Sequence, residues 1–174
     1  MRSHRAGRRL LLSAAAVLLV GCADLAPSPR GTEYAPTRVV LEAPTTTPIQ
    51  TVNNLTLVYA TINERQGALM VVDTGSQRTL LTPALLRRMN VPVPADAPRR
   101  RLYVVGGQMI EIPIIRIPSV RAGAAVVENL EVGVLDFLPR SPIIDGLLGG
   151  DFLSRFKATL DGQARLLRLE PLVR

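Results

Sequence analysis

The sequence is poor in the residues that most hydrolases use as nucleophiles or bases. Its 174 residues include one cysteine, Cys22, and one histidine, His4, both within the first 22 residues. Those residues have the features of a secretory signal, and the part that follows contains no imidazole and no free thiol. Ser-His-Asp, Cys-His and histidine-ligated zinc chemistry are therefore excluded from it. Carboxylates are the groups left for hydrolytic chemistry.

Aromatic residues and lysine are also scarce. The chain has no tryptophan, three tyrosines, three phenylalanines and a single lysine, Lys157. Without the four arginines of the signal segment, 17 of the 21 basic residues remain against 14 acids, a net charge of +3. A net charge this small attracts the phosphates of nucleic acids only weakly, and so few aromatic rings leave little surface on which bases could stack. Nucleic acid is therefore not an expected partner.

The first 21 residues are predicted to be a signal peptide. Arginines precede an apolar run from Leu10 to Val20, which is too short to span a bilayer as a helix. Leu19-Val20-Gly21-Cys22 resembles the lipobox of bacterial lipoproteins, in which the cysteine becomes the acylated first residue. The resemblance implies lipidation of Cys22 and a membrane anchor in the bacterial envelope, facing the periplasm. The next residue is not acidic, which favours the outer membrane; an ordinary signal peptide or an uncleaved anchor is the alternative.

Residues 22–50 are predicted to be a disordered tether that holds a domain off the membrane. The stretch is rich in proline and threonine and has no sustained apolar period. A short edge strand around residues 38–41 is the alternative for part of it. The folded domain is expected to span residues 51–174.

Most of that domain has the pattern of short strands and glycine-containing turns. The expected helices are short: one begins at Thr82-Pro83, and one spans residues 151–156. With no alternation of strands and long helices, the pattern predicts a mainly β fold, a small closed β-barrel with one or two short helices and one lobe per chain. The expected strands are residues 55–62, 68–72, 79–81, 102–105, 108–117, 120–122, 124–127, 130–135, 147–148, 156–160 and 164–169.

The domain is organised around Asp73, which ends an apolar strand. Thr74-Gly75-Ser76 follows it, so hydroxyl groups and a residue free to turn lie beside the carboxylate. The pKa of an acid at the exit of a buried strand is sensitive to burial and to a second nearby charge. We interpret Asp73 as catalytic; an ordinary strand-to-turn junction is the alternative.

Three other charged features carry weaker predictions. The arginines at 99–101 would either steer an acidic ligand or form a solvated face, and a solvated face is the commoner use of such a run. Asp145 and Asp151 are interpreted as structural acids, a turn residue and a helix-start residue.

Taken in order, these motifs resemble the retropepsin-like aspartic proteases in their bacterial single-domain form. The resemblance implies that Asp73 is catalytic, with Thr74, Gly75 and Ser76 supporting its loop. Leu147, Leu148 and Gly149 would pack against that loop. A glycine-tipped hairpin would form a flap over bound peptide, with the residues Tyr103, Val104, Val105, Gly106, Gly107 and Gln108.

The chain has one such tripeptide, so the resemblance implies a homodimer in which each copy supplies Asp73. The pair would activate a water molecule without any metal or cofactor. The expected function is an envelope-anchored aspartic endopeptidase acting on polypeptides. A non-catalytic peptide-binding or scaffolding lipoprotein of the same fold is the main alternative, and a purely structural envelope protein is a third.

Overall fold

The computed structural model describes residues 35–103 and 107–172. The described residues all belong to one compact unit. The predicted signal peptide and Cys22 lie outside the described residues.

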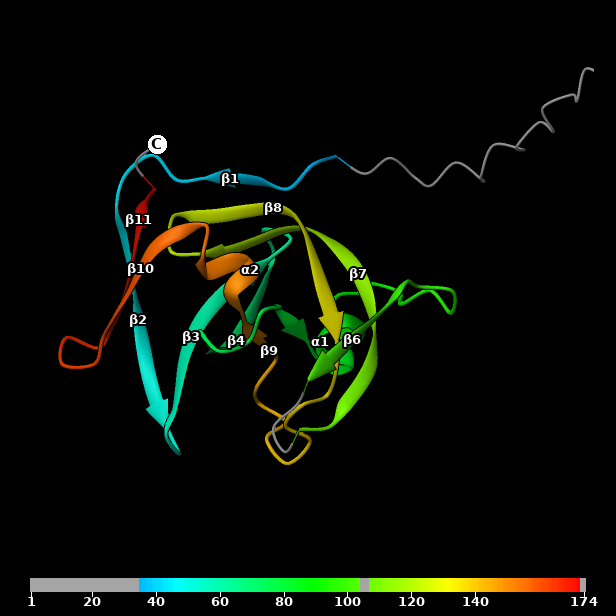
Figure 1. The fold of residues 1–174 in the computed structure, drawn as a ribbon. Helices are drawn as coiled ribbons and strands as arrows, with labels where there is room; N and C mark the ends of the chain where they lie inside the picture. Colours follow the sequence, from blue (N-terminus) through cyan, green and yellow to red (C-terminus); the bar gives the residue numbers. More distant parts are fainter. Residues whose placement is uncertain (1–34, 104–106, 173–174) are drawn as a thin grey trace, which may run out of the picture. The chain divides into compact units, whose positions relative to one another are not determined.

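In the described part of the chain, eleven strands form one connected sheet. Neighbouring strands follow the order β10-β11-β2-β3-β4-β9-β5-β8-β7-β6, and β1 pairs with β8. An additional pairing of β3 with β7 closes the path from β3 to β7 into a ring (Figure 1). The prediction of a mainly β fold is confirmed. The strands are β1 (Arg38–Val40), β2 (Thr45–Val52), β3 (Leu55–Ile62), β4 (Gln66–Val72), β5 (Leu80–Leu81), β6 (Arg99–Tyr103), β7 (Met109–Ala122), β8 (Ala125–Val134), β9 (Gly146–Leu148), β10 (Phe156–Asp161) and β11 (Leu166–Pro171).

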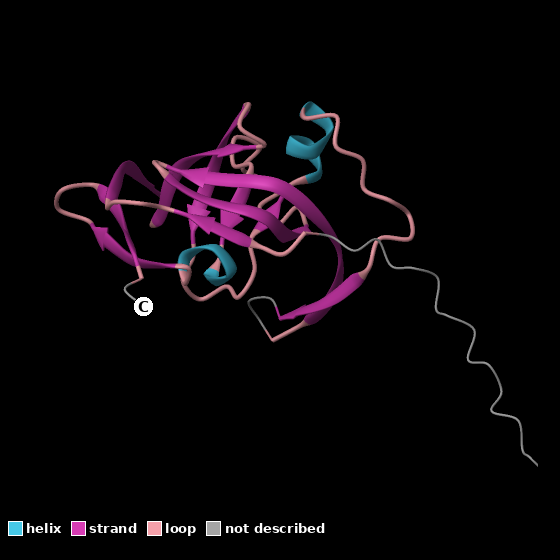
Figure 2. Ribbon diagram, turned by 90° about the horizontal axis from the view of Figure 1, so that it is seen from above, coloured by secondary structure: helices cyan, strands magenta, loops and turns pink. Residues whose placement is uncertain are grey.

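The described residues also form two short helices, which lie on opposite sides of the strands (Figure 2). Helix α1 (Pro83–Arg88) begins as predicted, because the Thr82 hydroxyl accepts a hydrogen bond from Leu85 N at 3.2 Å and proline occupies the first turn. Helix α2 (Gly150–Leu153) begins one residue earlier than predicted and is shorter, since Phe156 already belongs to β10.

The predicted hairpins β3–β4 and β10–β11 are confirmed by antiparallel pairing. Two predicted strand breaks are wrong. Strand β7 runs without interruption through residues 118–119, and β8 runs through residues 128–129. Asn129 has a φ of 55°, a backbone conformation that asparagine tolerates better than most residues, so the strand continues past it.

The predicted tether is wrong for the part of it that the structure describes as strand. Strand β1 pairs with β8, as the edge-strand alternative proposed. Residues 45–48 of β2 pair with β11 and residues 49–52 pair with β3, so β2 joins the two ends of the domain. Pro48 lies where β2 changes partner, a position at which a strand tolerates a missing N–H. The domain therefore begins before residue 51.

Two clusters of buried side chains lie on the two faces of the central strands. Met70 and Val72 of β4 belong to the main cluster, whereas Val71 between them belongs to the second. Strands β5 and β9 alternate in the same way, with Leu81 and Leu148 in the main cluster and Leu80 and Leu147 in the second. The strands that lead to Asp73 are thus buried on both faces, which explains their continuous apolar sequence.

Candidate active site

Asp73 directly follows β4, at the end of the parallel pairing between β4 and β9. The last parallel pair joins Val72 to Leu148. The backbone N–H of Asp73 then donates to the carbonyl of Leu148 at 3.1 Å. The sheet therefore fixes the backbone of Asp73 up to the point where the chain turns away, and leaves its side chain half-buried.

The Asp73 carboxylate is held by its own loop through one oxygen. Oδ1 accepts hydrogen bonds from the backbone N–H of Gly75 at 2.9 Å and of Ser76 at 3.2 Å. A Cβ at position 75 would lie 3.3 Å from this oxygen, a tight contact that glycine avoids. Among the described residues, Oδ2 has no hydrogen-bond partner. One oxygen is therefore positioned, and the other can meet a water molecule or a second carboxyl group.

The hydroxyl residues of the loop differ in what they contact. Ser76 Oγ donates to the carbonyl of Arg78 at 2.9 Å and lies 3.4 Å from Arg78 N, so it shapes the turn after Asp73. The Thr74 side chain is exposed, and no described residue forms a hydrogen bond with it. Ser76 thus has a visible supporting contact, whereas Thr74 points to solvent in the single chain.

The segment that begins at Gly149 holds the loop that follows Asp73 through backbone hydrogen bonds. Gly150 N donates to the carbonyl of Ser76 at 2.7 Å, and Asp151 N donates to the carbonyl of Gln77 at 3.2 Å. A Cβ at position 149 would lie 2.5 Å from backbone atoms of Arg78, so only glycine allows this approach. The structure therefore brings the predicted Leu-Leu-Gly element against the loop that holds Asp73.

A buried contact between Thr79 and Asp151 completes the clamp, and the sequence analysis did not predict this pair. Thr79 is fully buried. Its N–H donates to both carboxylate oxygens, at 2.8 and 3.0 Å, and its hydroxyl donates to Oδ1 at 2.6 Å. The same hydroxyl accepts from Gly149 N at 3.2 Å. The only sequence signal was an acid directly after the Leu-Leu-Gly-Gly element, without any sign of its partner.

Both acids interpreted as structural are held inside the fold. Burial raises the pKa of Asp151, while the hydrogen bonds from Thr79 and the charge of Arg78 act in the opposite direction. Asp145 accepts from Leu69 N at 3.1 Å and pairs with Arg88 at 2.6 Å. Asp145 therefore ties β4 and α1 to the start of β9.

The predicted flap corresponds to the ribbon formed by β6 and β7. Tyr103 pairs with Met109 at its far end, and Gly107 has a φ of 78°, which suits a glycine turn. Val104, Val105 and Gly106 lie outside the described residues. No hydrogen bond joins Tyr103, Gly107 or Gln108 to the Asp73 loop in the described part of the chain.

Asp73 does not line either of two surface hollows of the single chain. One, of about 740 Å³, lies beside the β3–β4 turn and α1, and the other, of about 500 Å³, lies between β1, α2 and the end of β11. Residues 35–103 and 107–172 contain no group of three or more metal-ligating side chains. No described helix has the length and apolar character needed to cross a membrane.

Comparisons with known proteins agree with this geometry. A family model described as "Aspartyl protease" matches residues 58–152, a stretch that includes Asp73, the β6–β7 ribbon and the Leu-Leu-Gly element. Among solved structures, the chain is similar to a retropepsin-like aspartic protease from Rickettsia conorii, with a TM-score of 0.55 and 22% sequence identity. The match covers 78% of this chain and 94% of that one, and it shows a retropepsin-like fold. A search of curated proteins gives no match.

Proposed function

Since this chain belongs to the aspartyl protease family, we propose that it is an endopeptidase whose catalytic residue is Asp73. The observation that carries the proposal is the state of the Asp73 carboxylate. Two backbone N–H groups fix Oδ1, while Oδ2 has no partner among the described residues. The sequence after Cys22 contains no histidine and no cysteine that could supply a different nucleophile or base.

The chemistry requires a second carboxyl group. One carboxylate cannot take a proton from water and donate a proton to the scissile carbonyl oxygen in the same step. Two close carboxyl groups repel each other enough to share one proton. The ionised member then removes a proton from water, the water oxygen attacks the carbonyl carbon, and the protonated member gives its proton to the carbonyl oxygen. When the tetrahedral intermediate collapses, the C–N bond breaks and the leaving amine receives a proton from the pair, while a hydroxyl group of the intermediate returns a proton to it.

The second carboxyl group is Asp73 of another copy of the chain. The sequence has a single Asp-Thr-Gly, and a symmetric dimer would bring two of them together. The half-buried setting of Asp73 supports a site that is open in one copy. The substrate would be a polypeptide in extended conformation, lying across the dimer under the β6–β7 ribbons and held by strand-type hydrogen bonds.

The lipobox-like sequence before Cys22 supports an envelope location. We place the enzyme on the periplasmic side of the outer membrane, anchored through acylated Cys22. A Cys22→Ser variant should move from the membrane fraction to the soluble fraction after cell lysis. A variant that stays fully with the membranes would contradict the lipid anchor.

The endopeptidase proposal is tested by an Asp73→Asn substitution. Cleavage of an unstructured protein between about pH 4 and pH 7 should fall by about a hundredfold or more, because the variant cannot supply the ionised member of the pair. Asp136→Asn provides the matched control, since Asp136 is an exposed acid in the loop that follows β8. Equal cleavage by the wild type and Asp73→Asn, or cleavage by neither, would exclude the proposal. Peptide binding without cleavage would favour a binding lipoprotein instead.

A further inference from the structure

Strand β6 ends the path of the sheet, and no other described strand covers its outer edge. Ile114 N donates to the carbonyl of Pro98 at 2.8 Å. In an antiparallel pair, hydrogen-bonded positions alternate. With this register, Arg100 and Leu102 direct their backbone groups toward β7. The backbone N–H and C=O groups of Arg99, Arg101 and Tyr103 consequently point to the open edge.

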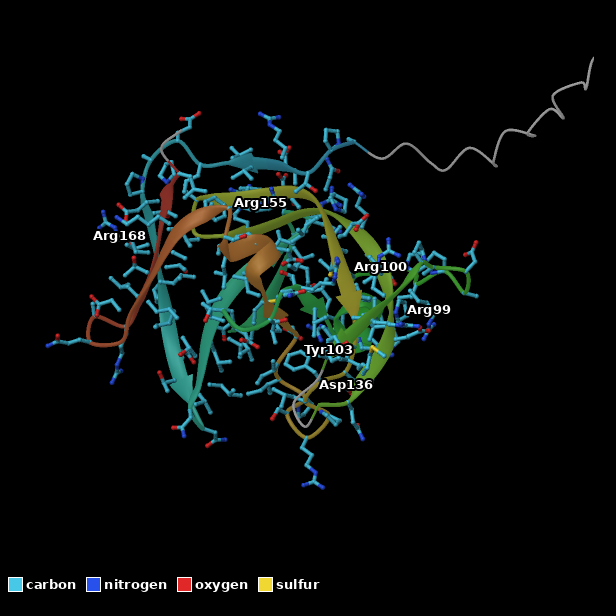
Figure 3. All side chains as sticks on the ribbon, in the orientation of Figure 1. Arg99, Arg100, Tyr103, Asp136, Arg155 and Arg168 are labelled. Carbon is cyan, nitrogen blue, oxygen red and sulfur yellow. The ribbon has the colours of Figure 1, made fainter. Side chains whose placement is uncertain are left out.

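The two faces of the β6–β7 ribbon differ in character. Leu102 and Ile110 pack on the second core cluster through the inner face. The outer face carries Arg99, Arg101 and Tyr103 on β6, with Met109 opposite Tyr103. Tyr103 is 77% exposed and Met109 is 49% exposed. Figure 3 shows Arg99 and Arg100 near the margin of the molecule and Tyr103 farther along β6. The outer face thus combines positive charge with exposed apolar surface.

Positive charge on β6 is only partly balanced. Within the described part of the chain, Glu111 is the one carboxylate that pairs with these arginines, at 3.5 Å from Arg101. Arg99 reaches only the backbone carbonyl of Glu111, and Arg100 reaches the carbonyl of Arg99. An acidic side chain placed beside Arg99 would therefore meet a guanidinium that has no carboxylate partner.

The same charges decide which kind of strand fits the edge. A second copy of β6 added antiparallel would set arginines against arginines, which like-charge repulsion disfavours. An acidic strand would instead place carboxylates beside Arg99 and Arg101 at alternate positions. The next side chain of this acidic strand on the outer face of the ribbon would contact Tyr103 and Met109.

We propose that the outer edge of β6 is a docking strip for an extended, acidic segment of a polypeptide. The segment adds as a strand to the backbone groups of Arg99, Arg101 and Tyr103, and its acidic side chains pair with the two arginines. The inference rests on the proposed function in one respect, because the segment would belong to a substrate that is cut elsewhere along its length. The strip then selects substrates by a feature outside the cleaved peptide.

The test measures binding by the full-length Asp73→Asn chain, so that turnover does not interfere. The probe is a fluorescent peptide of alternating glutamate and valine, followed by fluorescence anisotropy. The glutamate peptide should bind and its lysine counterpart should not, and binding should weaken as salt is added. Equal binding of the two peptides would overturn the proposal.

Three variants locate the interaction. Removing both outer-face arginines, R99S/R101S, should weaken binding by about three- to tenfold. R65S/R87S makes the same change of charge at exposed positions outside the ribbon and should bind like the parent chain. R100S removes an arginine from the inner face of the ribbon, so it should weaken binding less than R99S/R101S does. An equal loss in R65S/R87S would mean that only net charge matters, and would overturn the docking strip.

A proline separates strand addition from simple charge attraction. R101P and R101S lose the same charge, but only R101P loses the N–H at the open edge, a change that an edge strand tolerates. R101P should bind more weakly than R101S; equal affinities in chains of equal thermal stability would overturn strand addition. Arginine-dependent binding to anionic lipid vesicles without peptide binding would assign the strip to a membrane surface and overturn the proposal.

The two proposals fail separately. A chain that binds the acidic peptide through β6 but cleaves nothing contradicts the proposed protease and leaves the docking strip intact. A chain that cleaves unstructured protein but ignores the acidic peptide contradicts the docking strip alone.

Discussion

Asp151 joins the start of α2 to Thr79, so its ionisation bears on the stability of the Asp73 loop. Burial raises the pKa of its carboxyl above the ordinary value of 3.8. The folded chain then binds this proton more tightly than the unfolded chain does. The corresponding contribution to stability is fully present below the ordinary pKa and is lost as the pH rises through the raised pKa.

We predict that Asp151→Asn removes this part of the pH dependence. As the pH rises from below 3.8 toward neutrality, the free energy of unfolding of the wild type should fall relative to that of the variant. Urea unfolding at a series of pH values measures both. Asp136→Asn, at an exposed position, should follow the wild type. Parallel curves for the wild type and Asp151→Asn would contradict the prediction.

For single residues, the sequence predicts a structural position well when that position depends on neighbours in the chain. A carboxylate after an apolar strand and before a glycine turn is a local pattern, and it locates Asp73 and Gly75 correctly in the loop. The Thr79–Asp151 contact spans 72 positions. Neither residue is unusual in its own surroundings, so only the assembled sheet reveals the pair.

Strand β2 shows how much an element can depend on distant partners. Ile49 is 6% exposed and belongs to the main core, whereas Gln50 beside it is exposed. Ile49→Asp should lower the free energy of unfolding by about 3 kcal/mol or more, since it buries a charge without a partner. Gln50→Asp should change it by less than about 0.5 kcal/mol. Chemical unfolding measures both, and equal effects would mean that β2 is not an integral part of the domain.

The same strand explains why element prediction fails where it does. The hairpins are predictable because their turns and both of their strands lie within one short stretch of sequence. Strand β2 draws its partners from β3 and β11, and its threonines and Pro48 have the composition of a linker. The composition of a segment says nothing about its distant partners. Strand β2 is ordered by its pairing with β3 and β11, which its own composition does not reveal.

Assembly of two chains is the prediction that belongs to the whole molecule. If each site needs Asp73 from both copies, a dimer of one active and one inactive chain should not cleave. After exchange between equal amounts of wild type and Asp73→Asn, about one quarter of the dimers would hold two Asp73 residues, whereas independent sites would retain about half of the activity.

Cleavage by such mixtures distinguishes the two cases. Activity per total chain should follow the square of the wild-type fraction. Asp136→Asn mixed in the same way should leave activity unchanged, because this variant keeps its Asp73. A linear dependence on the wild-type fraction would show that one chain suffices, and sedimentation of the same samples would report the dimer directly.

The insertion of β9 between β4 and β5 also constrains the order in which the molecule can be completed. The ribosome makes Asp73 and its loop well before residues 148–151, whose backbone groups hold that loop against the sheet. A nascent chain that lacks these residues has the carboxylate without its clamp. The geometry at Asp73 thus depends on contacts between residues far apart in the sequence, and non-local contacts of this kind slow folding. Biosynthesis itself would keep the Asp73 site incomplete until residue 151 has been made.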